Sequence, residues 1–185
     1  MSIQQHILNE FPFKPTSDQI EAIHQFSDFI NDNTSSKIFL LKGYAGTGKT
    51  TMIASWLKPL QKTGYKPVLM APTGRAAKVM STYAKTKAAT IHKRIYFAQQ
   101  GKQGGIQFKL QKNKFKKAVF IVDEASMIGD EKSSAKLFQN GSLLQDLIQY
   151  AHEGFQCKLV FVGDTAQLPP VKRELSPALN QDYLS

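Results

Sequence analysis

The stretch of sequence that decides the fold is Lys37-Ile38-Phe39-Leu40-Leu41-Lys42-Gly43-Tyr44-Ala45-Gly46-Thr47-Gly48-Lys49-Thr50-Thr51. Its first part is a short apolar run, which is typical of a buried strand. At Gly43 the run changes into a glycine-rich loop with the pattern G-x-x-x-x-G-K-[ST], and residues 51–60 then favour a helix. A strand, such a loop and a helix in this order predict a phosphate-binding P-loop.

The residue types in this loop suit a nucleoside triphosphate with its magnesium ion. Glycines let backbone N–H groups close around phosphate oxygens, and the positive end of the following helix dipole faces the same oxygens. Lys49 can carry its charge to the β- and γ-phosphates, and Thr50 can offer a hydroxyl to Mg²⁺. We therefore predict ATP and Mg²⁺ as cofactors, with the nucleotide contacted by Gly43, Ala45, Gly46, Thr47, Gly48, Lys49, Thr50 and Thr51.

A pair of carboxylates, Asp123 and Glu124, follows the apolar run Ala118–Val122, which is predicted to be a buried strand. Downstream of a P-loop, the first of two such carboxylates can hold Mg²⁺ together with Thr50, and the second can polarise the attacking water. Asp123 is therefore the predicted metal residue, and Glu124 is the predicted base.

Two glutamines complete the predicted nucleotide site. Gln167 follows another predicted strand, Leu159–Val162, and its amide can both donate to the γ-phosphate and accept from water, so it joins Lys49 and the carboxylates as a catalytic candidate. Gln19 has two interpretations. It fits a helix-capping box with Thr16, or it pairs with adenine through both amide atoms.

Composition narrows the class of protein. The chain has 185 residues, of which 42% are hydrophobic, so one domain with a sizeable core is expected. The single cysteine, Cys157, excludes an internal disulfide framework and a cysteine zinc cluster, and its apolar neighbours predict a buried thiol. The first residues lack the pattern of a signal peptide, and no apolar run approaches the ~20 residues of a membrane span. We expect a cytoplasmic protein without membrane contact.

Positive charge is concentrated in the middle of the chain. The net charge is +10, and 18 of the 24 Lys and Arg residues lie between Asp32 and Asp123, where no acidic residue occurs. A solvated surface normally mixes both signs, whereas a single-sign block beside a phosphate-binding loop suggests a polyanion, and nucleic acid is the predicted partner.

Two segments of this basic block are candidates for nucleic-acid contact. The predicted strand Pro67–Ala71 leads into Pro72 and Thr73, and Thr73 is either an ordinary helix cap or part of a phosphate-contacting loop on the P-loop edge of the sheet. Lys93–Lys117 has eight basic residues, no acidic residue and interleaved aromatics. It predicts a hairpin with arms at 95–99 and 106–112, which either stacks on bases or is a surface insertion.

With these segments in order, the chain resembles the first motor domain of superfamily 1 helicases, in the RecD-like and Dda-like branch. The resemblance covers about residues 16–171 and rests on five segments, which are similar to motifs I, Ia, Ib, II and III of that family: Gly43–Thr50, Ala71–Ala77, Thr90–His92, Asp123–Ser126 and Gly163–Pro170. Gln19 matches the adenine-reading glutamine of the family.

The resemblance implies an α/β P-loop NTPase (RecA-like) fold, with a mainly parallel sheet, helices on both faces and a small β-hairpin insertion. It implies ATP-driven movement 5′ to 3′ on single-stranded DNA, and residues 94–117 would be the pin that helps to split the duplex. The implied DNA contacts are Pro72, Thr73, Arg75, Lys78, Thr90, His92 and Phe97.

Residues 1–185 would then form one motor domain, and a second motor domain with motifs IV to VI is expected to be needed for full activity. Three classes stay open on the residues: a helicase motor, a P-loop ATPase or kinase of another kind, and a module that binds nucleic acid without turnover. RNA is not excluded as the nucleic acid.

Overall fold

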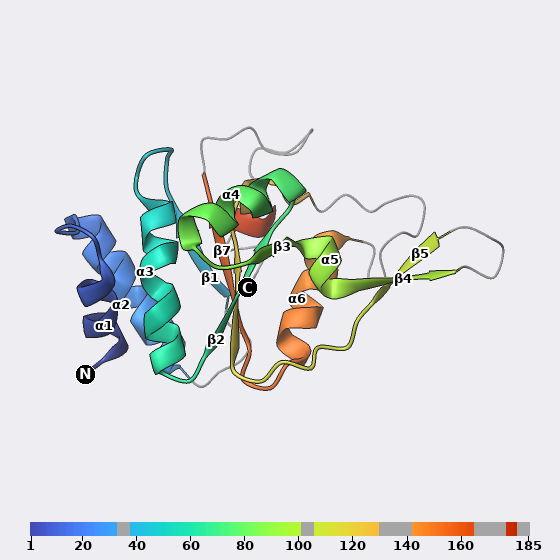
Figure 1. The fold of residues 1–185 in the computed structure, drawn as a ribbon, viewed down its shortest axis with the longest axis horizontal. Coiled ribbons are helices and arrows are strands. Elements are labelled where there is room, and N and C mark those ends of the chain that lie inside the picture. The colour runs from blue at the N-terminus through green and yellow to red at the C-terminus, as the bar shows by residue number, and fades with distance from the viewer. Residues whose placement is uncertain (33–37, 101–105, 130–141, 165–176, 181–185) are drawn as a thin grey trace.

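A computed structural model of the chain describes residues 1–32, 38–100, 106–129, 142–164 and 177–180. At its centre lies a parallel sheet of five strands in the order β1-β7-β6-β2-β3 (Figure 1). These strands are β1 (Ile38–Lys42), β7 (Lys158–Gly163), β6 (Ala118–Val122), β2 (Lys66–Ala71) and β3 (Ala88–Thr90). The neighbours in this order are far apart in the sequence, so the helices between them are crossover connections.

Alternating side chains divide the sheet residues between two hydrophobic cores. In β6, Val119 and Ile121 belong to one core, whereas Ala118, Phe120 and Val122 belong to the other. All five residues are fully buried, as the long apolar runs in the sequence predict for a parallel sheet with both faces covered.

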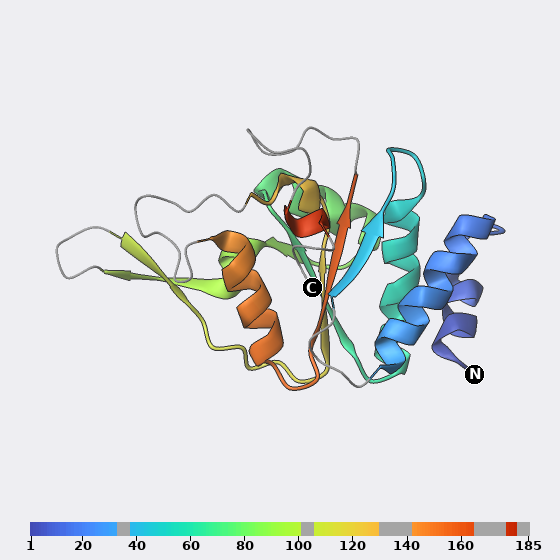
Figure 2. The same cartoon turned by 180° about the vertical axis from the view of Figure 1, so that it is seen from behind.

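Helices α2 (Ser17–Asn31) and α3 (Lys49–Lys62) cover one face of the sheet, and α4 (Gly74–Ala84) packs beside α3 (Figures 1 and 2). Helix α1 (Ile3–Glu10) packs on the outside of α2 and α3. Trp56 of α3 lies at the centre of this first core, where its ring stacks on Phe26 of α2 with 4.0 Å between ring centroids. Trp56 is therefore a core residue, as its helical spacing predicts.

The other face is covered by α5 (Ile91–Ile95) and α6 (Leu143–Glu153), together with two short 3-10 turns, η1 (Ala125–Met127) and η2 (Pro177–Leu179). The thiol of Cys157 is buried in this second core, as predicted, and burial raises its pKa. The fold class expected from the sequence is thus confirmed: an α/β domain with helices on both faces of a parallel sheet.

A two-stranded antiparallel hairpin projects from the α5 and α6 side of the domain (Figures 1 and 2). It consists of β4 (Tyr96–Gln100) and β5 (Ile106–Leu110). At its base, the Tyr96 hydroxyl donates to the fully buried carboxylate of Asp146 in α6, at 2.6 Å. The Gln111 side chain also donates to the Tyr96 carbonyl, at 2.6 Å. These contacts tie the hairpin to the second core.

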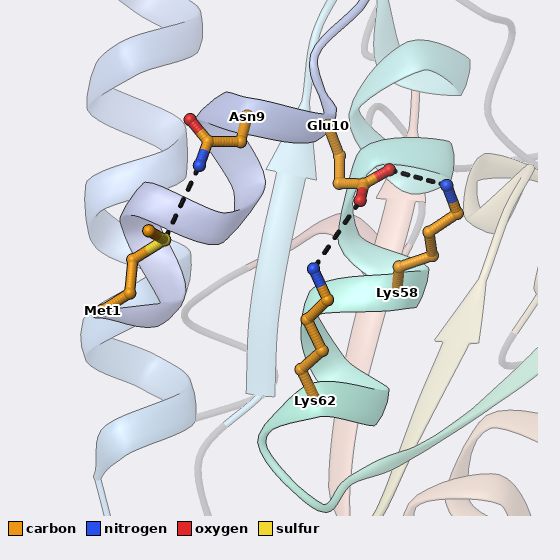
Figure 3. A network of polar contacts seen from close by, with 5 residues as sticks. All are labelled: Met1, Asn9, Glu10, Lys58 and Lys62. Atoms are coloured by element: carbon orange, nitrogen blue, oxygen red, sulfur yellow. Dashed lines mark hydrogen bonds and ion pairs between the residues drawn. The ribbon is translucent and has the colours of Figure 1, made fainter.

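Helix α1 was not expected, because residues 1–15 show little pattern. It begins with a capping box between Ser2 and Gln5, and it buries Ile3 and Ile7. Its last residue, Glu10, pairs with Lys58 of α3 at 2.9 Å and lies 3.9 Å from Lys62 (Figure 3). A helix this short is marginal alone, so packing on α3 is what makes it form.

A proline is expected to end or kink a helix, but Pro59 does not end α3, which runs on to Lys62. Burial of Leu60 in the first core favours the extra turn. The Thr63 backbone N–H donates to the Pro59 carbonyl at 3.1 Å, and the Thr63 hydroxyl donates to the Leu60 carbonyl at 2.9 Å. These bonds cap the last carbonyls beyond the proline.

Around residue 90 the sequence missed the short strand β3 and the one-and-a-half-turn helix α5. Ile95, expected in the first arm of the hairpin, is the last residue of α5 and lies in the second core. The two arms otherwise lie where they were predicted. Residues 33–37, 101–105 and 165–176 fall outside the described part, and the catalytic candidate Gln167 is among them. Among the described residues, no helix is long and apolar enough to cross a membrane.

The bond between Tyr96 and Asp146 yields the first prediction. Tyr96→Phe removes a donor from a buried carboxylate and should lower the free energy of unfolding by about 1.5–3 kcal/mol, which corresponds to roughly 3–12 °C in Tm. Tyr44→Phe, at an exposed tyrosine, is the matched control and should change little. Thermal melts by circular dichroism check this, and equal Tm values for the two variants would contradict it.

Candidate functional site

The carboxyl ends of four strands are joined at one edge of the sheet. The Gly43 N–H after β1 donates to the carbonyl of Gly163, the last residue of β7, at 3.3 Å. The Asp123 N–H after β6 donates to the Met70 carbonyl of β2 at 3.0 Å. The segments that follow these strands therefore start side by side, although they lie far apart in the sequence.

A cavity of about 450 Å³ opens at this edge. It brings together the loop after β1, the first turn of α3, the two carboxylates after β6, and the end of β7. Its walls are formed by Phe13, Ala45, Gly46, Gly48, Lys49, Thr50, Thr51, Asp123, Glu124, Gly163 and Asp164. Except for Gly43 and Thr47, the predicted phosphate residues thus share one cavity with the predicted metal residues and the predicted base.

The loop between β1 and α3 has a conformation that requires glycine at two positions. Gly46 and Gly48 have φ values of +80° and +89°, in the left-handed region that L side chains rarely adopt. A Cβ on Gly48 would also lie 2.6 Å from Nε2 of Gln19. Gly48 is the N-cap of α3 and makes no side-chain cap hydrogen bond, and the first residues of the helix, Lys49, Thr50 and Thr51, line the cavity.

Lys49 lies at the first position of α3, and its side chain turns back toward the loop. Its Nζ donates to the carbonyls of Gly43 and Tyr44, at 2.7 and 2.8 Å. An ammonium group has three hydrogens, so two are used within the loop and one remains for an anion in the cavity. The charge is therefore held at a fixed place against the cavity wall.

Gln19 satisfies the capping interpretation and also contacts the loop. Its Oε1 accepts from the Thr16 N–H at 3.0 Å, and its Nε2 donates to the Thr47 carbonyl at 3.1 Å. Each amide atom has capacity for one more hydrogen bond, so the adenine interpretation stays a prediction. Gln19 and Phe13 both line a second cavity of about 610 Å³, which adjoins the first at Gly48.

The second carboxylate has an unusual backbone. Glu124 has φ 54° and ψ 36°, which is left-handed, and this conformation costs about 1–2 kcal/mol in a residue with a Cβ. The Glu124 N–H donates to Oδ1 of Asp123 at 2.9 Å, a bond that helps to hold the turn. The turn directs Glu124 into the same cavity as Lys49.

Tyr83, in the last turn of α4, is a site residue that the sequence did not indicate. Its hydroxyl donates to Oδ2 of Asp123 at 2.7 Å. Burial raises the pKa of this phenol far above its usual range, and the negative charge of Asp123 raises it further, so the hydroxyl keeps its proton. Forty positions separate the two residues in the sequence, which left no signal to find the pair.

The donor set in the cavity suits magnesium. Asp123 supplies a carboxylate, Thr50 supplies a hydroxyl, and both line the 450 Å³ cavity. The described residues contain no cluster of three or more His, Cys, Asp or Glu side chains that could hold a metal by themselves. Mg²⁺ is commonly bound through one or two protein oxygens together with phosphates and water, and Asp123 and Thr50 could supply such oxygens.

All the predicted nucleic-acid residues except Phe97 lie on β3, on α5 and on the segment and helix that follow β2. Thr73 caps α4 by accepting from the Ala76 N–H at 3.2 Å, so its role as a cap is confirmed. Arg75 and Lys78 are exposed on the first turns of that helix. Ala71 at the end of β2 pairs with Thr90 at the end of β3. The segments that follow the two strands, Pro72–Thr73 and Ile91–His92, therefore leave the sheet next to each other.

Two further candidates differ in exposure. His92 is half-buried, and burial lowers the pKa of its imidazole, so its ring is neutral at pH 7. Phe97 is 44% exposed on the hairpin, and Phe108 is 43% exposed. Phe97 pairs with Lys109, whereas Phe108 pairs with Ala98, so the two phenyl rings lie on opposite faces of the ribbon.

Comparison with known proteins agrees with this geometry. The family described as "AAA domain" matches residues 27–173. The ATP-dependent RecD2 DNA helicase of Deinococcus radiodurans is 30% identical over 138 residues, which are 73% of this chain and 16% of the helicase. The ATP-dependent DNA helicase Dda of Enterobacteria phage T4 is 30% identical over 148 residues, which are 78% of this chain and 30% of that protein.

An uncharacterized protein of Acanthamoeba polyphaga mimivirus is 33% identical over 178 residues, which are 84% of this chain and 33% of that protein. Among solved structures, the large terminase of bacteriophage HK97 matches 88% of this chain and 38% of its own chain, with a TM-score of 0.53 and 13% identity, a likeness of fold alone. The chain thus spans a third or less of these curated relatives. The chain belongs to the AAA domain family and, within it, to the RecD-like and Dda-like type of superfamily 1 helicase motor domain.

Proposed function

We propose that the chain is the ATP- and magnesium-binding motor domain of a DNA helicase that moves 5′ to 3′ along single-stranded DNA. The observation that carries the proposal is the shared cavity of Lys49, Thr50, Asp123 and Glu124. The relatives described as ATP-dependent DNA helicases support the choice of substrate. The direction of movement rests on the resemblance to the family.

Each residue of the cavity has a role in this proposal. The loop N–H groups and Lys49 hold the phosphates, and Gln19 with Phe13 faces the base in the second cavity. Asp123 and Thr50 would hold Mg²⁺, whose positive charge would stabilise the negative charge on the transferred phosphoryl group. Glu124 orients and deprotonates the attacking water. Gln167 keeps its predicted role beside the γ-phosphate.

Single-stranded DNA would cross the edge of the sheet beside this cavity. Arg75 and Lys78 are exposed cations on α4, and a backbone phosphate is the ligand they suit. Thr90, His92 and Pro72 line the neighbouring strand ends, and Phe97 offers an exposed ring for a base. A second motor domain would complete the strand-binding groove and the ATP-hydrolysing site.

Lys49 gives the second prediction. Lys49→Ala should lower the affinity for ATP with magnesium at least about tenfold, because a charge-assisted contact to phosphate is lost. The fold should be unchanged. Lys58→Ala, on the exposed side of the same helix, is the control and should bind as the wild type does. Calorimetric titration with a non-hydrolysable ATP analogue checks this, and wild-type affinity in Lys49→Ala would contradict the assignment.

The third prediction separates chemistry from binding at Glu124. Glu124→Gln should slow ATP hydrolysis by about 10²- to 10⁴-fold in the intact motor and leave nucleotide affinity unchanged. Glu124→Gly should be equally inactive but more stable than Glu124→Gln, by up to about 1 kcal/mol, because glycine adopts the left-handed backbone without strain. Phosphate-release assays and thermal melts decide both points, and normal hydrolysis by Glu124→Gln would exclude it as the base.

The fourth prediction concerns nucleic acid. Arg75→Ala or Lys78→Ala should weaken binding to every single-stranded sequence. Each variant should also make the plot of log affinity against log salt concentration less steep, by about 0.7 in slope per lost phosphate contact. Lys62→Ala, at the other end of α3, is the control. Fluorescence anisotropy of a labelled DNA oligonucleotide across a salt series measures this, with an RNA of the same sequence alongside. If the affinity depends neither on salt concentration nor on either substitution, the basic surface does not bind nucleic acid.

A further inference from the structure

Asp123 is held by a contact that neither the motifs nor the comparisons explain. Tyr83 reaches it from α4, and its ring packs against the first core while its hydroxyl donates to Oδ2 at 2.7 Å. The other oxygen, Oδ1, accepts from the Glu124 N–H at 2.9 Å. Both carboxylate oxygens therefore have a donor from the protein, one from the neighbouring backbone and one from a separate helix.

Two donors on different oxygens fix the plane of a carboxylate. They also leave it able to take a ligand, because a carboxylate has about four lone-pair positions and these bonds use two. The chemical nature of the second donor matters as well. A lysine or arginine at this place would neutralise Asp123 and compete with a cation, whereas a neutral phenol orients the carboxylate and leaves its charge in place.

We propose that Tyr83 is a positioning residue, which holds the Asp123 carboxylate in the orientation that binds Mg²⁺ and joins it to helix α4. The inference rests on the proposed function, in which Asp123 holds the metal. It goes further by naming a residue outside the motifs and a physical link between the metal site and the helix that carries Arg75 and Lys78.

The link is short. Helix α4 has 11 residues, with the exposed cations on its first turns and Tyr83 in its last turn. Met80 of the same helix is fully buried in the first core, so the helix is held as one body. A shift of α4 caused by a bound strand therefore reaches Oδ2 of Asp123 through one hydrogen bond. The expected result is a coupling between nucleic-acid binding and magnesium-nucleotide binding, which must be reciprocal.

The test uses Tyr83→Phe, which removes one oxygen and keeps the ring in the core. Tyr65→Phe is the matched control, since Tyr65 is also partly buried and donates to a backbone carbonyl, that of Ile30, at 3.4 Å away from the cavity. The affinity for a fluorescent ATP analogue is measured with magnesium and with EDTA. The ratio of these two affinities reports the metal contribution, and thermal melts verify that each variant is folded.

Tyr83→Phe should reduce the ratio about 3- to 10-fold and leave the affinity in EDTA unchanged, because one hydrogen bond to a charged group is lost. Tyr65→Phe should keep the wild-type ratio. A normal ratio in Tyr83→Phe, or an equal loss with and without magnesium, overturns the inference. Asp123→Asn distinguishes failure of this inference from failure of the proposed function. If Asp123→Asn lowers the ratio of the two affinities and Tyr83→Phe does not, the metal role of Asp123 holds and the role of Tyr83 is wrong. If Asp123→Asn keeps the wild-type ratio, both the metal role of Asp123 and the inference fail.

The link to α4 is tested with the same proteins and a single-stranded DNA oligonucleotide at saturation. In the wild type, DNA should change the affinity for the magnesium-nucleotide analogue about fivefold or more. Tyr83→Phe should remove most of this change while still binding DNA. No coupling in the wild type, or coupling of wild-type size in Tyr83→Phe, would show that this hydrogen bond does not join the two sites.

Discussion

The parallel register of β1, β7, β6 and β2 is the constraint on which the rest of the molecule depends. Hydrogen bonds from Gly43 to Gly163 and from Asp123 to Met70 continue that register past the strand ends. Because all four strands run in the same direction, the loop, the carboxylates and the start of α4 emerge at one edge. A shift of one residue in any strand would exchange its two faces and break both cores, so the register is strongly fixed.

The two cores have different tasks in this arrangement. The first core, with Trp56 stacked on Phe26, fixes α3 and therefore the first turn of the helix, which lines the cavity. Helix α1 packs against α3 from outside, and Phe13, in the segment after α1, lines the cavity. The second core holds α6 and the base of the hairpin, where a buried carboxylate fixes Tyr96. The nucleotide side and the hairpin side are thus anchored on opposite faces of one sheet.

The carboxylate pair is where the structure departs from relaxed geometry. Glu124 has a left-handed backbone conformation, and its side chain lines the cavity. Its N–H donates to Asp123, and this hydrogen bond stabilises the turn. Tyr83 of α4 then donates to the other oxygen. Strain in Glu124 and a partly buried hydroxyl that donates to Asp123 are features of a site that is oriented before its ligand arrives.

The sequence by itself determined the fold class, the four central strands, the helices after the P-loop and after Pro72–Thr73, and the hairpin arms, because apolar runs and turn residues are local signals. It also identified most of the residues that line the cavity, although not Phe13. Helices α1 and α5 and strand β3 needed the tertiary structure, since short elements form only when packing stabilises them. The bond between Tyr83 and Asp123, the bridge from Gln19 to the loop, and the left-handed turn at Glu124 were decided by tertiary structure alone. Each joins residues that no spacing rule relates, or depends on a backbone angle that composition does not reveal.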